Sequence, residues 1–276
     1  MEGSSSEAIV KDCHRTFPDN PYFTTEAAQN KLYRVLNAYA KHDPDVGYCQ
    51  GMNFLTGLLL LHVEEETAFA LLVHIMNTCG VRGIYLPNMS QLQLRLRQLS
   101  YLVLTHLPRL HQHFMETGIQ IVIFASPWYL SLYTSEFSLN FAGRVTDIML
   151  ADRSDAILTK VALALLMEAQ ERILEQDGFE MTIIYLKSEI HEWSRERLNQ
   201  VITEAAAMTD INAQSLDALA LQFEEEDRLQ AAEDALLASE GSNNSQQSTG
   251  GEDLKAIISY MDLLGMDNED MEGEGE

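Results

Sequence analysis

Apolar side chains at helical spacing recur along most of this chain, and they constrain its fold more than any other feature. Residues at positions i, i+3, i+4 and i+7 lie on one face of a helix. Two stripes have this spacing, Leu32, Val35, Leu36 and Tyr39, and Phe69, Leu72, Val73 and Met76; two comparable helical stripes are Leu92, Leu96, Leu99 and Val103, and Ile157, Val161, Ala164 and Leu165. Alternating, strand-like runs are scarce, and no repeat of about 20 to 50 residues indicates a solenoid. We therefore predict an all-α fold, a multi-helix domain.

Acidic residues are concentrated at the carboxyl end of the chain. Of 42 acidic and 18 basic residues in total, 17 acidic and 2 basic residues lie within residues 211–276. We expect an acidic helix over residues 211–240 and a flexible linker over residues 241–251, which are rich in Gly, Ser, Asn and Gln. An acidic tail over residues 252–276 follows.

A short helical pattern lies inside the acidic tail, at Leu254, Ile257, Ile258 and Met261. Two interpretations of this amphipathic helix stay open. In the first, residues 252–266 dock in a groove of a further protein partner. In the second, the helix is marginal and folds back on its own domain or frays.

The formal charge of −24 at pH 7 limits the classes of partner. It would repel nucleic-acid phosphates and anionic lipid, so we expect no nucleic-acid partner. Three scattered cysteines are too few for a disulfide framework, which favours a cytoplasmic location. The longest apolar stretch, residues 54–63, is about half of the roughly 20 residues that a membrane span requires, so we expect no transmembrane segment. We expect residues 1–8 to be a disordered leader, and the folded domain to cover residues 9–210.

Several patterns typical of catalytic sites are absent from the sequence. There is no Gly-x-x-x-x-Gly-Lys-Ser/Thr or Gly-x-Gly-x-x-Gly stretch, so we do not expect the chain itself to bind GTP or ATP. His191-Glu192 begins like a metalloprotease motif, but Arg195 stands where the second histidine is needed, so we expect no metal site. Cys49 as a thiol nucleophile lacks a histidine at diagnostic spacing, and such a cysteine is more often simply packed.

The first segment that indicates function contains Ile9, Asp12 and Arg15. These residues are three apart, so on a helix they lie close to one face, and the Asp12 carboxylate can orient the Arg15 guanidinium. Pro18 disfavours a helical conformation at Phe17, which places Arg15 at a helix end. Spacing alone favours an ordinary surface ion pair over a functional arginine.

The second segment runs from Asp43 to Asn53. Asp43-Pro44 and Gly47 indicate a turn, and the apolar run that starts at Phe54 opens a helix. Tyr48 and Gln50 therefore lie on a glycine-flanked loop or in the first turn of that helix. Flanking glycines let the backbone approach another molecule closely, although a glutamine in a loop is usually only solvated.

Together the two segments resemble the paired signature of the TBC domain of Rab GTPase-activating proteins. The matching residues are Ile9-x-x-Asp12-x-x-Arg15 and Tyr48-x-Gln50-Gly51-Met52, and two further stretches, Pro127-Trp128-Tyr-Leu-Ser-Leu-Tyr133 and Arg144-Val-x-Asp147, are similar to later family segments. These matches occur in the family's order, and the resemblance covers roughly residues 8–210.

The resemblance implies an activity that acts in trans on a Rab family small GTPase. In this family an arginine and a glutamine both enter the GTPase active site, and these residues match Arg15 and Gln50. By the same resemblance Asp12 holds Arg15, and Tyr48 helps to position Gln50. Four matched positions are expected to contribute to partner binding: Gly51, Trp128, Arg144 and Asp147. The partner would carry the GTP and Mg²⁺, so the chain would bind no cofactor directly and would have no catalytic activity on its own.

The chain also departs from the family pattern at its amino-terminal end. Family members carry an Arg-x-x-x-Trp motif and several helices upstream, whereas eight residues precede Ile9, so we expect the amino-terminal part of the domain to be absent. Two functions follow. The first is a Rab GTPase activator in vesicle trafficking, recruited to endomembranes through its partner. The second is a catalytically inactive, TBC-like binding or scaffold protein.

Overall fold

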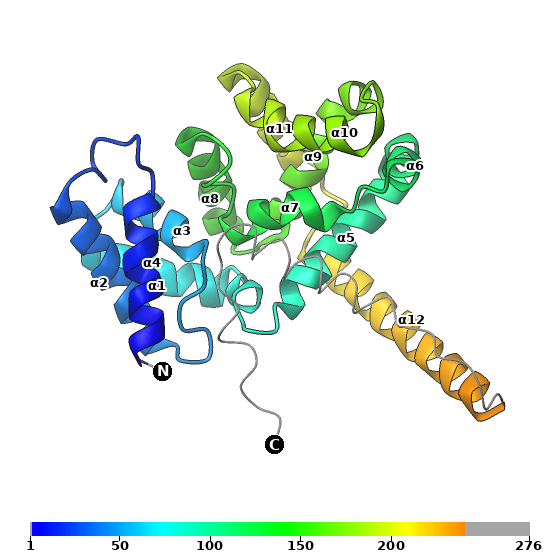
Figure 1. Cartoon of the computed structure of the whole chain (residues 1–276), viewed down its shortest axis with the longest axis horizontal. Helices are drawn as coiled ribbons and strands as arrows, with labels where there is room; N and C mark the ends of the chain where they lie inside the picture. The colour runs from blue at the N-terminus through cyan, green and yellow to red at the C-terminus, as the bar shows by residue number, and fades with distance from the viewer. Residues whose placement is uncertain (1, 241–276) are drawn as a thin grey trace. The chain divides into compact units, whose positions relative to one another are not determined.

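The computed structural model describes residues 2–240, and this part of the chain is helical with no strand (Figure 1). The first group of helices is α1 (Glu2–Arg15), α2 (Glu26–His42), α3 (Met52–Leu60) and α4 (Glu65–Thr78). The 3-10 helix η1 (Arg82–Ile84) connects it to a second group: α5 (Ser90–His106), α6 (Pro108–Thr117), α7 (Ile121–Leu130), α8 (Leu139–Asp152), α9 (Ala156–Leu174), α10 (Gly178–Lys187), η2 (Glu189–Glu192) and α11 (Arg195–Ala207). The predicted all-α fold is confirmed.

Helices α1 to α4 pack on one another at the amino-terminal side of the domain (Figure 1). The predicted stripe of α2 is buried over its whole length, at Leu32, Val35, Leu36 and Tyr39. Helix α2 begins where the Thr25 hydroxyl accepts a hydrogen bond from the Ala28 amide, which satisfies one of the free donors of a helix start. On α4 the buried face is rotated from the predicted one: it consists of Ala68, Leu72, Ile75 and Met76, while Phe69 and Val73 are only half-buried.

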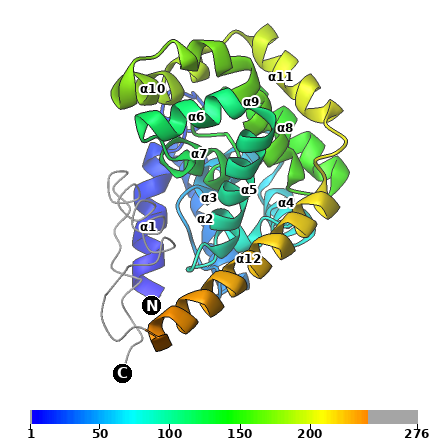
Figure 2. The same ribbon diagram turned by 90° about the vertical axis from the view of Figure 1, so that its right-hand side faces the viewer.

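Helix α9 forms the centre of the second group. It packs against α5, α6, α7, α8, α10 and α11, and several of these helices lie side by side in the turned view of Figure 2. Its buried residues include the predicted stripe and the positions between, among them Leu158, Val161, Ala162, Leu163, Leu165 and Leu166. A helix with neighbours on all sides buries apolar residues around its circumference.

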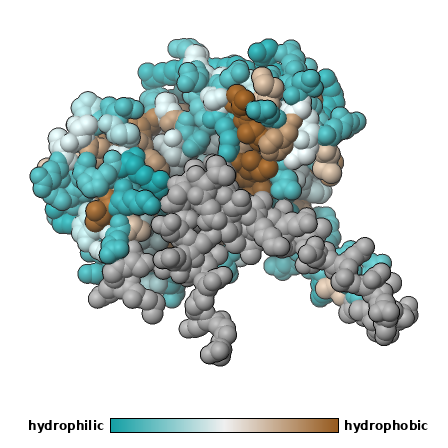
Figure 3. Space-filling model, in the orientation of Figure 1, coloured by the Kyte–Doolittle hydropathy of each residue, from teal (hydrophilic) through white to brown (hydrophobic). Residues whose placement is uncertain are grey.

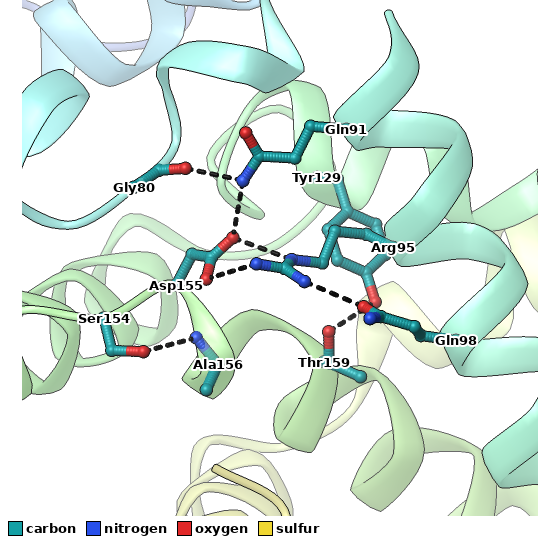
Figure 4. Close-up of polar contacts among 9 residues, drawn as sticks. All are labelled: Gly80, Gln91, Arg95, Gln98, Tyr129, Ser154, Asp155, Ala156 and Thr159. Atoms are coloured by element: carbon teal, nitrogen blue, oxygen red, sulfur yellow. Dashed lines mark hydrogen bonds and ion pairs between the residues drawn. The ribbon is translucent and has the colours of Figure 1, made fainter. Parts of the chain in front are cut away.

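A buried ion pair joins α5 to the start of α9 (Figure 4). The guanidinium of Arg95 donates two hydrogen bonds to the Asp155 carboxylate, at 2.8 and 2.9 Å, and a third to Gln98 at 2.8 Å. Gln91 also donates to Asp155, at 3.2 Å, and to the carbonyl oxygen of Gly80, at 2.6 Å. The pair is almost closed to solvent, with side-chain exposures of 10% for Arg95 and 7% for Asp155. Such a bidentate pair fixes both the distance and the rotation between two helices.

The structure corrects one predicted boundary. Residues 2–8, expected to be a disordered leader, form the first two turns of α1, and the Ser6 hydroxyl hydrogen-bonds the Tyr33 hydroxyl of α2 at 2.7 Å. The Gly-Ser-Ser-Ser run at positions 3–6 has no apolar stripe of its own, so the pattern could not reveal a helix that is held by its neighbour.

The chain divides into a compact unit up to Met208 and a second unit from Thr209. The described part of the second unit is α12 (Ala213–Glu240), which lies within the predicted acidic helix. It begins with a reciprocal cap, in which Asn212 Oδ1 accepts from the Ser215 amide and Ser215 Oγ accepts from the Asn212 amide. The predicted linker over 241–251 and the tail over 252–276, with its docking segment, lie outside the described residues.

The face shown in Figure 3 is mostly hydrophilic, and its largest hydrophobic area lies in the part of the view where α7, α9 and α10 lie. Phe179, Met181 and Ile184 of α10 are among the large apolar residues with exposed side chains. No helix within the described residues is long and apolar enough to cross a membrane.

Candidate functional site

The carboxyl end of α1 presents Arg15. The helix ends at this residue, and Phe17, just before Pro18, adopts a left-handed φ of 49° that turns the chain away. Asp12, one turn earlier, is only 4% exposed, and its Oδ1 accepts a hydrogen bond from Arg15 Nε at 2.7 Å. The Arg15 side chain is 36% exposed, so the guanidinium is anchored at one edge and reaches solvent.

The loop that carries Gln50 leads from α2 to α3, as predicted from the sequence. Its first turn is closed by the Gly47 amide, which donates to the Asp43 carbonyl oxygen at 2.8 Å. Arg82 of η1 then binds this turn from outside: it donates two hydrogen bonds to the Asp43 carboxylate, both at 2.7 Å, and one to Asp45 at 3.0 Å. The guanidinium holds the pKa of Asp43 below its usual value. The sequence pattern does not reveal this role of Arg82, because its partners lie about 40 residues earlier and no local pattern connects them.

The Asp12 carboxylate joins the two segments. Its Oδ1 holds Arg15, and its Oδ2 accepts a hydrogen bond from the Tyr48 hydroxyl at 2.5 Å. We call these three residues, Asp12, Arg15 and Tyr48, the Asp12 cluster. Because Tyr48 lies two residues before Gln50, the cluster anchors the Gln50 loop to the end of α1. The side-chain amide of Gln50 makes no hydrogen bond to a described residue, and the residue is half-buried.

Tyr48 of the Asp12 cluster and the two neighbouring cysteines, Cys13 and Cys49, are kept neutral by their surroundings. Burial, followed by the negative charge of Asp12, raises the pKa of Tyr48 well above its ordinary value. The same two causes raise the pKa of Cys13 and of Cys49 to about 12. Both thiols are therefore protonated at neutral pH, which disfavours the thiol-nucleophile interpretation of Cys49.

Gly51, on the other side of Gln50, packs against the end of α7. It has φ 106°, and a Cβ atom there would lie 2.3 Å from the Leu130 carbonyl oxygen. The same carbonyl oxygen accepts a hydrogen bond from the Tyr85 hydroxyl at 2.9 Å. Gly51 is therefore required by its contact within the chain, and its backbone is buried.

Trp128 occupies the core and not a binding surface. Its exposed fraction is 0%, and its ring packs against Phe124, Tyr133 and Phe137. The expectation that this side chain binds a partner is wrong for a direct contact, because no part of it reaches the surface. The matching segment instead builds the end of α7, against which the Gln50 loop rests.

Arg144 and Asp147 lie on α8, apart from the Asp12 cluster in the hydrogen-bond network. Both residues are exposed, and neither forms a hydrogen bond or ion pair with a described side chain. Their expected role in partner binding stays a prediction. Among the described residues, no group of three or more His, Cys, Asp or Glu side chains is arranged to hold a metal ion.

The all-α domain and its two joined segments indicate a helical protein family, which similarity to known proteins identifies. The family described as "Rab-GTPase-TBC domain" matches residues 2–174. The chain belongs to this TBC-domain family.

Relatives and solved structures agree with this assignment. "TBC1 domain family member 4" of Mus musculus is 39% identical over 213 residues, which are 76% of this chain and 16% of that protein. "Rab GTPase-activating protein eat-17" of Caenorhabditis elegans is 38% identical over 187 residues, which are 67% of this chain and 21% of that protein. The chain thus spans about a fifth of the length of these relatives.

Two solved structures share the fold. The TBC domain of a Chlamydomonas flagellar RabGAP aligns with a TM-score of 0.64 and 30% identity, over 72% of this chain and 66% of that one. The Ypt/Rab-GAP domain of Gyp1p aligns with a TM-score of 0.65 and 21% identity, over 74% of this chain and 73% of that one.

Proposed function

We propose that this chain is a GTPase-activating protein for a Rab family small GTPase. The observation that carries the proposal is the Asp12 carboxylate, which binds Arg15 and Tyr48 at once and so links the two segments that bear Arg15 and Gln50. Relatives named as Rab GTPase-activating proteins, such as the C. elegans protein, support it.

The two partly exposed side chains, Arg15 and Gln50, suit GTP hydrolysis. The reaction needs positive charge to stabilise the transferring phosphoryl group and a hydrogen-bonding group to orient the attacking water. Arg15 supplies a permanent, planar charge, and its Nε bond to the Asp12 carboxylate orients the guanidinium. Gln50 supplies an amide that both donates to and accepts from the water.

The partner GTPase supplies the rest of this reaction. GTP and Mg²⁺ enter with the partner, and the chain contributes Arg15 and Gln50 in trans. Through its partner the chain would be recruited to endomembranes and would act in vesicle trafficking.

Single-turnover GTP hydrolysis by a panel of GTP-loaded Rab proteins tests the proposal. We expect at least one Rab to be accelerated by about 10³-fold or more, the lower end of what an arginine supplied in trans contributes. Arg15→Ala and Gln50→Ala should each abolish most of the acceleration without loss of helicity, because neither side chain is part of the core.

The matched control is Arg109→Ala. Arg109 is also an exposed arginine in an ion pair, with Glu171 at 3.0 Å, but it lies on α6, away from the Asp12 cluster. It should leave the acceleration unchanged. If the folded wild-type chain binds a GTP-loaded Rab but accelerates hydrolysis by none, the proposal is wrong and the chain is an inactive binding protein.

A further inference from the structure

A second connection joins α1 to the Gln50 loop, and it is entirely buried. The Thr16 hydroxyl donates to the Asp12 carbonyl oxygen at 2.7 Å and accepts from Asn53 Nδ2 at 2.9 Å. Asn53 Oδ1 in turn accepts from the Gly51 amide at 3.0 Å. Thr16 and Asn53 are 1% and 0% exposed. We call these two side chains the buried relay.

The relay ends on the peptide group between Gln50 and Gly51. The amide of this peptide is held by Asn53, and its carbonyl oxygen is approached by the Cys49 thiol, with sulfur and oxygen 3.6 Å apart. On the far side of this peptide, Gly51 is packed against Leu130. The orientation of this peptide fixes the direction in which the Gln50 side chain leaves the backbone.

Helix α3 approaches the end of α1 closely enough to make the relay short. Asn53 and Gly57 are four residues apart and share one face of α3. A Cβ atom on Gly57 would lie 2.9 Å from the Phe17 ring and 3.0 Å from Thr16 Cγ2. The glycine therefore lets α3 come close to Thr16, so that Asn53 reaches its hydroxyl.

The bonding in the relay is polarised in one direction. The Thr16 hydroxyl has one proton, which it gives to the Asp12 carbonyl, so toward Asn53 it can only accept. Asn53 must then present its NH₂ group to Thr16 and its oxygen to the Gly51 amide. A side chain without both a donor and an acceptor cannot satisfy both neighbours.

We propose that Thr16 and Asn53 are positioning residues that set the orientation of Gln50 relative to Arg15. This inference rests on the proposed function and extends it. The Asp12 cluster ties the side chains of the two segments together, while the buried relay ties their backbones. Because the relay starts at the carbonyl of the residue that holds Arg15 and ends at the amide after Gln50, it couples the two functional positions without contacting the substrate.

The test compares Thr16→Val, which keeps the shape of the side chain and removes its hydroxyl, with Thr16→Ser, which restores the hydroxyl. Two readouts are taken: hydrogen exchange of the Gly51 amide in the chain alone, and the kinetics of Rab GTP hydrolysis. We expect Thr16→Val to speed Gly51 exchange and to lower kcat by about 10²-fold with KM unchanged, as for a small misplacement of a catalytic group. Thr16→Ser should restore both.

A matched control separates positioning from general stability. Thr182 of α10 is also 0% exposed, donates to the carbonyl oxygen four residues earlier at 2.8 Å, and has a second partner, His113, at 3.4 Å. Thr182→Val should leave Gly51 exchange and kcat unchanged. A double variant, Thr16→Val with Gln50→Ala, should be no slower than Gln50→Ala alone, because the relay acts through Gln50.

The outcomes are distinguishable. Unchanged Gly51 exchange in Thr16→Val, or equal effects of Thr16→Val and Thr182→Val, would overturn the buried relay as a positioning device. Faster Gly51 exchange with normal kcat would also overturn it, since Gln50 would then not depend on the relay. If the wild-type chain accelerated no Rab, the proposed function would be wrong, and so would the effect of the relay on kcat. The hydrogen exchange of the Gly51 amide tests the relay separately, and unchanged exchange in Thr16→Val would overturn it.

Discussion

At the scale of single residues, Gly51 shows how a position can be fixed by two independent restraints. Its φ of 106° lies where residues with a Cβ atom are strained, and its Cα faces the Leu130 carbonyl oxygen. The first restraint is local and the second comes from α7, about 80 residues later in the chain. Only the second ties the Gln50 loop to the rest of the domain.

Gly51→Ala should therefore destabilise the domain by about 2 kcal/mol or more, because it adds both backbone strain and a clash with Leu130. Gly118→Ala is the matched control, since Gly118 also has a positive φ, 73°, but nothing lies within 4 Å of its added Cβ. Urea unfolding followed by circular dichroism measures both variants. Equal losses in the two variants would show that the Leu130 contact contributes nothing.

At the scale of helices, the packing of α5 on α9 depends on the Arg95–Asp155 pair (Figure 4). Removing one partner leaves an unpaired buried charge, which typically costs about 3–5 kcal/mol. Removing both leaves an apolar contact and avoids that cost.

Arg95→Met is therefore expected to lower the free energy of unfolding by about 3–5 kcal/mol, and the double variant Arg95→Met with Asp155→Leu to recover most of it. As a control, Arg172→Ala breaks a pair with Glu175 in which both side chains are 59% exposed, and should cost under about 1 kcal/mol. Chemical denaturation measures all three. A double variant as unstable as Arg95→Met would contradict this account.

Another element-scale feature is His191, which η2 places against the segment between α7 and α8. Its side chain is 13% exposed, its ring contacts Phe137, and its Nδ1 lies 3.6 Å from Glu136 Oε2. Burial outweighs a hydrogen bond to the backbone of Lys187 and lowers the pKa of His191 to about 4. Burial also raises the pKa of Glu136 and lowers that of Lys187, so the surroundings favour neutral forms.

A group whose pKa is lower in the folded state than in the unfolded state takes up a proton on unfolding. Wild-type stability should therefore fall, relative to His191→Gln, as pH drops from about 7 to 4, by up to about 1.4 kcal/mol per pH unit. The measurement is the difference between the unfolding free energies of the two proteins at each pH. Glu136, whose raised pKa changes stability in the opposite direction, is present in both proteins, so its effect cancels in this difference. A difference that is independent of pH would contradict the assignment.

At the scale of the whole molecule, every residue of the Asp12 cluster and the buried relay precedes α4. Deletion of residues 241–276 should therefore leave Rab GTP hydrolysis unchanged, in a single-turnover assay against the full chain. A loss of turnover on deletion would show that the acidic tail takes part in the reaction.

The sequence predicts the fold and the two functional segments better than it predicts the long-range contacts that hold these segments in place. Helical periodicity finds the buried face of α2, and the spacing of Asp12 and Arg15 anticipates their ion pair, because both are local properties. The role of Arg82 and the burial of Trp128 depend on partners far along the chain. No local sequence pattern indicates such distant partners. A side chain that matches a family motif, such as Trp128, can therefore be a buried core residue and not a binding residue.

The two functional side chains, Arg15 and Gln50, are separate from the core of the domain, and this separation has an evolutionary consequence. The side chains of Arg15 and Gln50 lie outside the core, whereas Asp12, Gly51 and Trp128 are buried. Under the proposed function, a single substitution of Arg15 or of Gln50 would yield a descendant that still folds and still binds its GTPase. Such a descendant would shield the GTP-bound state instead of ending it, so the same scaffold lies one substitution away from the opposite signalling effect.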